Sequence, residues 1–189
     1  MTPMADEVWL VRHGETEWSR DGRHTSTTDL ALTDEGRRVA ETLHDRLDHE
    51  GFALVLTSPR ERARETARLA GHGDATVDDD LAEWDYGELE GRTTPQIRET
   101  YPDWSIWQGP VPGGESAAQV SERLDRVVAR CRDAAGRVLL FGHGHSLRAL
   151  AARWLDLPVA EGRHLKLDTS TLSVLGWERE TPVVLRWNA

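Results

Sequence analysis

Cationic and imidazole side chains follow three short apolar runs of this sequence, at residues 8–11, 52–56 and 138–141. The side chains are Arg12, His13, Arg60, Arg62 and His143. If the runs are strands of one open α/β sheet, their carboxyl ends meet in the crevice where such sheets bind ligands. Two imidazoles and paired guanidinium groups around one anion indicate phosphate, because the planar fork of arginine matches two phosphate oxygens at once. The pattern predicts a phosphate site at that edge.

Helical segments alternate with these strands. One helix is expected to begin after Thr33, an N-cap residue that acidic side chains follow in the first turn. Further helices are expected at residues 62–69, 116–133 and 146–154, and two last strands at 172–177 and 183–187 around a turn at Pro182. Strands that alternate with helices predict an α/β fold, here a three-layer α/β/α sandwich with a mostly parallel central sheet.

The length of 189 residues fits one domain, 1–189. Residues 78–115 form an irregular excursion, rich in Gly, Pro and Trp, which we expect to cover one face of the active site like a lid. A net charge of −10 argues against nucleic acid and anionic lipid as partners, so any anion site must depend on local arginines.

Cysteine usage and the N-terminal sequence indicate a reducing compartment. Cys131 is the single cysteine, so no intramolecular disulfide forms and no cysteine-based zinc cluster can assemble. The first residues of the chain show no basic stretch followed by a long apolar run, so no secretory leader is expected, and no apolar run is long enough to span a bilayer. We therefore expect a cytoplasmic protein that does not act at a membrane.

Four segments carry a resemblance to a known family. LVRHGETEW, SPRERARETA, LAEWDYGELEG and FGHGHSLRAL resemble, in this order, the signature segments of the histidine phosphatase superfamily, also called phosphoglycerate mutase-like. The resemblance covers nearly the whole chain, and four motifs in order are far more specific than a lone Arg-His-Gly string. It implies a phosphoglycerate mutase-like fold and phosphoryl transfer that needs neither a metal nor a cofactor.

The resemblance implies a role for each residue of the catalytic core. His13 matches the nucleophile, whose neutral imidazole would become phosphohistidine while its other ring nitrogen donates to a backbone carbonyl. Arg12 and Arg62 match the phosphate-clamping arginines. His143 matches the second histidine, expected to donate to the same oxygens as an imidazolium. Glu83 matches the general acid that protonates the leaving alkoxide and then, as a carboxylate, activates water.

Further positions match the lining of the family's substrate pocket. They are Ser19, Thr25, Ser26, Tyr86, Gly144 and His145. The mutases usually carry asparagine, glycine and asparagine where this chain has Ser19, Ser26 and His145, and these departures concern the substrate rather than the phosphoryl chemistry. Gly14 is expected to let the backbone approach the His13 ring.

Several residues have a plainer interpretation. Arg60, Arg64 and Arg68 are expected on a solvated helix face. The histidines expected on the surface or in loops are His24, His44, His49, His72 and His164. His143 and His145 have the spacing of some metal sites, but no nearby cysteine or carboxylate cluster completes one. The Gly-His-Gly-His-Ser string resembles a nucleophile elbow only superficially, because its serine is not central.

Three enzyme classes and one binding class remain open. A mutase must keep water from its phosphorylated intermediate, and the modest excursion and short tail favour a phosphatase with a small phosphomonoester substrate. The run from Glu83 to Trp104 resembles relatives described as acid or sugar-phosphate phosphatases. A phosphohistidine protein phosphatase would lack much of the excursion, and a non-catalytic phospho-ligand binding module would have lost part of the core. A second anionic group of the substrate would contact Arg92, Arg98 or His145, although unpaired surface charge is the favoured interpretation of the two arginines. A homodimer is suggested by analogy alone.

Overall fold

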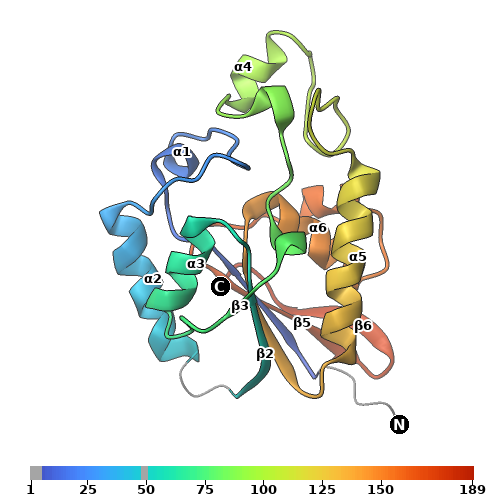
Figure 1. Ribbon diagram of the computed structural model, residues 1–189. Helices are drawn as coiled ribbons and strands as arrows, with labels where there is room; N and C mark the ends of the chain where they lie inside the picture. Colours follow the sequence, from blue (N-terminus) through green and yellow to red (C-terminus); the bar gives the residue numbers. More distant parts are fainter. Residues whose placement is uncertain (1–5, 48–50) are drawn as a thin grey trace.

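The computed structural model describes residues 6–47 and 51–189, and a six-stranded sheet runs through the middle of the molecule (Figure 1). The strand order is β3-β2-β4-β1-β5-β6. The strands are β1 (Val8–Arg12), β2 (Phe52–Thr57), β3 (Thr76–Val77), β4 (Arg137–Gly142), β5 (Leu172–Glu178) and β6 (Thr181–Arg186). The first four strands in that order pair in parallel, while β5 is antiparallel to both β1 and β6. The sheet is therefore mostly parallel, as predicted.

Helices cover both faces of the sheet. The helices are α1 (Glu17–Arg20), α2 (Asp34–Leu47), α3 (Glu61–Leu69), α4 (Thr94–Arg98), α5 (Ala117–Asp133) and α6 (Gly144–Trp154), with 3₁₀ turns η1 (Asp79–Leu81), η2 (Gly87–Leu89) and η3 (Val159–His164). In Figure 1, α2 and α3 lie on one side of the sheet, and α5 and α6 lie on the other. This arrangement confirms the three-layer α/β/α sandwich.

Side chains that alternate along β1 join the two halves of the core. Val8 and Leu10 pack with the cluster that includes α5 and α6, whereas Trp9 and Val11 pack with the cluster that includes α2 and α3. Strands buried on both faces read as continuous apolar runs, which is why these strands could be recognised in the sequence.

Local capping explains where the helices begin. The Thr33 hydroxyl accepts the backbone N–H of Gly36 at 2.9 Å, as its position before α2 predicts. Ser116 and Gln119 form a reciprocal capping box at the start of α5, and Thr93 and Gln96 form another at α4.

The last hairpin differs from the prediction. Its turn lies at residues 179–180, where Arg179 has a φ of 57°, and Pro182 lies inside β6, opposite Trp177. The sheet tolerates this proline because β6 is an edge strand. Strand β3, helix α1 and the 3₁₀ turns were not predicted.

The excursion at residues 78–115 extends beyond the sheet edge and carries η1, η2 and α4 (Figure 1). Its tryptophans Trp84, Trp104 and Trp107 are buried in the larger core cluster, so packing of the excursion onto the sheet is confirmed. Over the described part of the chain, no helix combines the length and apolarity that crossing a bilayer requires.

Candidate active site

The carboxyl ends of three parallel strands bring the predicted residues together. Arg12 pairs with Gly142 in the β1/β4 register, and the backbone N–H of His13 donates to Gly142 O at 2.9 Å. On the other side of β4, the N–H of Ser58 donates to Phe141 O at 2.9 Å. Residues from distant parts of the sequence therefore share one edge of the sheet.

His13 is held as a neutral imidazole. Its Nδ1 lies 2.7 Å from the carbonyl oxygen of Gly14, and since a carbonyl only accepts, Nδ1 carries the proton and Nε2 keeps its lone pair. Burial, followed by the charges of Arg62 and Arg12, lowers the pKa of the His13 imidazole well below its ordinary value. His13 lines the pocket, and its Nε2 carries no proton.

His143 lies behind His13 at the start of α6. The two ring centroids are 5.1 Å apart, and His143 Nε2 is 2.7 Å from the hydroxyl of Ser58. Burial, then the charges of Arg62, His13 and Arg12, lowers the pKa of His143 well below its ordinary value. The expected imidazolium is thus not what this environment favours: desolvation beside two guanidinium groups favours the neutral ring.

The two predicted arginines flank these histidines. Arg12 donates from one terminal nitrogen to Leu167 O at 2.5 Å. Arg62 is fully buried and donates to the backbone carbonyls of Thr25, Ser26 and Thr28 at 3.1–3.2 Å. Arg62 therefore positions the loop before α2 and also contributes a positive charge to the site.

Buried donors without a partner gather around His13. Among the described residues, Nε of Arg12, Nε of Arg62 and Nδ1 of His143 are buried and make no hydrogen bond to protein. Buried polar groups are nearly always paired, and several such groups beside one imidazole fit an oxyanion ligand. Arg60 was expected on a solvated helix face, but it is half-buried and its Nε makes no hydrogen bond to the described residues. Arg64 and Arg68 are exposed, as expected.

Glu83 lies in the excursion, and its side chain contacts the first turn of α6. Its Oε1 accepts the backbone N–H groups of Trp84 and Ser146 at 2.8 and 2.7 Å, and its Oε2 accepts that of His145 at 3.0 Å. A carboxylate is well placed at a helix N-terminus, where free N–H groups and the helix dipole stabilise negative charge. Glu83 and His13 line the same pocket.

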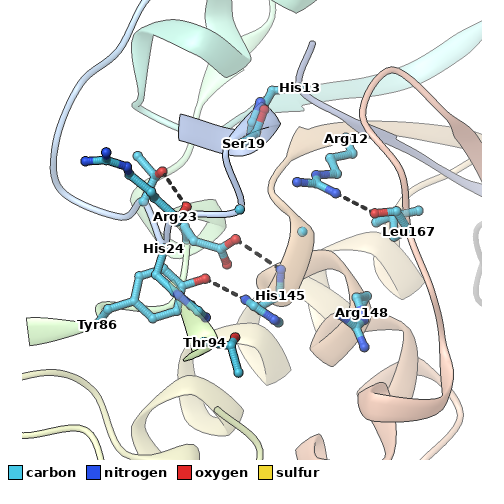
Figure 2. Close-up of a pocket in the computed structure, with 14 residues that line it drawn as sticks. Arg12, His13, Ser19, Arg23, His24, Tyr86, Thr94, His145, Arg148 and Leu167 are labelled. Carbon is cyan, nitrogen blue, oxygen red and sulfur yellow. Dashed lines mark hydrogen bonds between the residues drawn. The ribbon is translucent and has the colours of Figure 1, made fainter. Parts of the chain in front are cut away.

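The pocket has a volume of about 270 Å³, and Figure 2 shows its lining. Its lining residues are Arg12, His13, Ser19, Gly22, Arg23, His24, Thr25, Glu83, Tyr86, Thr94, Gly144, His145, Arg148 and Leu167. Five of the six residues predicted to line it do so. The sixth, Ser26, is buried and does not line the pocket, and its hydroxyl donates to the Glu90 carboxylate. Arg62 and His143 are also buried beneath the lining.

His24 lies in a loop, as expected, but its place in the pocket was not predicted. It lines the pocket, and both its backbone N–H and its Nδ1 contact Arg92 O, at 3.0 and 2.8 Å. His44 and His164 are exposed as expected, His72 is half-buried, and His49 lies outside the described residues. His24 had no motif to mark it, because its position depends on contacts with the excursion.

Arg148 is a second pocket residue that the sequence analysis missed. Its guanidinium carbon lies 4.8 Å from the Trp107 ring centroid, and its Nε donates to Gly162 O at 3.1 Å. Arg148 follows His145 by three residues, so the two share a face of α6, which was a usable signal. Arg92 and Arg98 instead donate to the backbone of their own segment and do not line this pocket.

The structure also bears on the expectations for Gly14 and for a metal site. A Cβ on Gly14 would lie 2.8 Å from Gly36 O, so this glycine allows close contact with the start of α2 rather than with the His13 ring. Within residues 6–47 and 51–189, no group of three or more His, Cys, Asp or Glu residues is arranged to hold a metal ion.

Comparisons with known proteins agree with this geometry. Residues 8–189 match the histidine phosphatase superfamily (branch 1). The acid phosphatase of Mycobacterium tuberculosis is 46% identical over 173 residues, which are 89% of this chain and 85% of that protein. The sedoheptulose 1,7-bisphosphatase of Saccharomyces cerevisiae is 36% identical, over 84% of this chain and 71% of its own. A solved Mycobacterium tuberculosis structure aligns with a TM-score of 0.90 and 42% identity over 97% of each chain.

Proposed function

Because the chain belongs to the histidine phosphatase superfamily, we propose that it is a phosphomonoesterase that hydrolyses a small phosphorylated metabolite through a phosphohistidine on His13. The observation that carries this proposal is the neutral His13 with its unprotonated Nε2, surrounded by buried donors that have no protein partner.

In the first step, Nε2 of His13 attacks phosphorus, the new P–N bond forms, and the P–O bond to the alcohol breaks in line with it. Glu83 gives its proton to the leaving alkoxide. Arg12, Arg62 and His143 donate to the phosphoryl oxygens, whose charge is redistributed in the transition state. No metal ion takes part in this scheme.

In the second step, water attacks the phosphohistidine. Glu83, now a carboxylate, takes a proton from the water while the new P–O bond forms and the P–N bond breaks. The N–H groups at the start of α6 support the charged form that this step requires.

Mutase-type phosphoryl transfer is the alternative, and it differs only in the acceptor. Relatives named as an acid phosphatase and a bisphosphatase support water as the acceptor. A phosphoglycerate mutase assay beside a phosphate-release assay separates the two. Interconversion of phosphoglycerates faster than phosphate release would establish the mutase.

The outer pocket carries guanidinium groups beyond the proposed phosphate clamp. Arg23 and Arg148 also line it, and we propose that a further anionic or oxygen-rich group of the substrate binds to them. Arg148→Gln should raise KM for sugar bisphosphates more than for phenyl phosphate, whereas Arg153→Gln, on the same helix but away from the pocket, should affect both equally little.

The first experiment is phosphate release from an activated aryl phosphate in excess EDTA. Wild type should turn over, His13→Ala should not, and His164→Ala should behave as wild type because His164 is exposed and does not line the pocket. Turnover by His13→Ala, or an inert wild type, would contradict the proposal. A non-catalytic phospho-ligand binding module would then be favoured if inorganic phosphate still bound.

A further inference from the structure

The ring of His145 is held in one orientation. Its backbone N–H donates to Glu83 Oε2 at 3.0 Å, which fixes the start of the side chain. Its ring stacks on that of His24, with centroids 5.9 Å apart and an interplanar angle of 5°. Trp107 meets it edge-on at 5.4 Å. With contacts on several sides, the imidazole has little freedom to flip.

Tyr86 contacts one nitrogen of this ring. The Tyr86 hydroxyl oxygen lies 2.6 Å from His145 Nδ1 (Figure 2). Among the described residues the Tyr86 hydroxyl has no other hydrogen-bond partner, and a buried phenol donates its proton where an acceptor lies within reach, so the hydroxyl donates and Nδ1 accepts. Burial raises the pKa of Tyr86 well above its ordinary value and lowers that of His145 well below. The phenol therefore keeps its proton and the imidazole stays neutral.

The other ring nitrogen of His145 is left available to a ligand of the pocket. A neutral imidazole that accepts at Nδ1 must carry its proton on Nε2. Within the described residues, His145 Nε2 has no hydrogen-bond partner, and His145 lines the pocket. The two pocket histidines thus differ: His13 presents a lone pair from Nε2, whereas His145 presents an N–H.

We propose that Tyr86 is a positioning residue that fixes His145 as the Nε2–H tautomer, so that His145 donates to an oxygen on the alcohol part of the substrate. The alcohol part is the appropriate target because the His145 backbone contacts Glu83, the residue proposed to protonate the leaving oxygen. The inference rests on the proposed hydrolysis and narrows its substrates to phosphates of polyols, such as sugar phosphates, which carry a hydroxyl beside the ester.

The tautomer can be tested without turnover. Two-bond ¹H–¹⁵N spectra of histidine-labelled protein, assigned with His145→Gln, should show His145 as Nε2–H in wild type and a population of Nδ1–H in Tyr86→Phe. Tyr101→Phe is the matched control, because Tyr101 is the other tyrosine and does not line the pocket. An Nδ1–H His145 in wild type, or an unchanged tautomer in Tyr86→Phe, would overturn the proposal.

The substrate contact is tested by kcat/KM for phenyl phosphate and for the best polyol phosphate of a panel. Tyr86→Phe should lose about tenfold more on the polyol phosphate, the value of one hydrogen bond. In a His145→Gln background the same change should add no discrimination, because an amide donates without a tautomer. Equal losses on both substrates, or no turnover of any polyol phosphate, would overturn this contact. Failure of wild type on every phosphomonoester would instead contradict the proposed function, while the spectra would still report the tautomer.

Discussion

Replacing Arg123 by methionine removes a buried guanidinium that ties α5 to the segment before Glu83. Arg123 is 8% exposed and holds the Glu115 carboxylate with two bonds of 2.7 and 2.8 Å. It also donates to the backbone carbonyls of Asp80 and Ala82 at 2.7 and 2.9 Å. Methionine keeps the length and helix propensity but satisfies none of these acceptors.

Breaking one partner of a buried ion pair costs about 3–5 kcal/mol. The Glu115 side chain is 22% exposed, so part of its charge is hydrated in the variant and the lower figure applies. We therefore expect the free energy of unfolding to fall by about 3 kcal/mol, which for a domain of this size lowers Tm by roughly 6–12 °C. Because Ala82 leads directly into Glu83, kcat/KM should also fall at temperatures where the variant is folded.

Urea unfolding followed by circular dichroism measures the stability change, and phosphate release measures the activity. The matched control is Arg126→Met, one turn along α5, whose side chain is 54% exposed and pairs with Asp80 near water. That variant should lose much less stability than Arg123→Met, because water screens its ion pair. Equal losses in the Arg123 and Arg126 variants would refute the reasoning.

Three further predictions concern the site. The rate of phosphate release should follow a bell-shaped pH profile with its maximum on the acidic side of neutrality. Neutral His13 and protonated Glu83 are both needed, and burial keeps the pKa of His13 low. A rate that rises steadily to alkaline pH would exclude the role of Glu83 as general acid. Burial lowers the pKa values of His13, His143 and His145, so as the pH falls the unfolded chain binds protons before the folded chain does. The free energy of unfolding, measured in urea, should therefore decrease below about pH 6.5, by up to about 1.4 kcal/mol per pH unit for each histidine. A free energy of unfolding that is independent of pH in this range would mean that these rings are charged when folded. Glu83→Ala should lower phosphate release from alkyl phosphates by about 10²–10⁴-fold but from an activated aryl phosphate far less, since the latter needs little protonation; similar losses would remove Glu83 as the general acid.

The sequence was most informative where strands end. Apolar runs that are buried on both faces could be recognised directly, and the topology places the polar residues after them at one edge. That is why His13 and His143 could be expected to lie together. Their charge state could not be predicted, because it depends on desolvation and on guanidinium groups whose distance only the structure gives.

Residues that depend on contacts between loops were missed or misplaced. Strand β3 has two exposed residues and no periodic pattern to identify it. Ser26 matches a pocket position of the family, but Glu90 and Arg62 hold its loop so that the side chain turns away from the pocket. His24 reaches the pocket only because the excursion folds over it, and no local pattern encodes that contact.

The pairing of β1 with β4 also determines at which stage of folding the chain becomes active. The two strands lie at residues 8–12 and 137–142, yet they are neighbours in the middle of the sheet, and His13, the proposed nucleophile, directly follows β1. Bringing them together closes a loop that contains most of the chain, a step with a large entropic cost. A partly folded chain could already contain α5, β4 and α6 and still be inert. The enzyme would therefore become active only when its first strand inserts, and proteolytic removal of that strand would abolish chemistry carried by the rest of the chain.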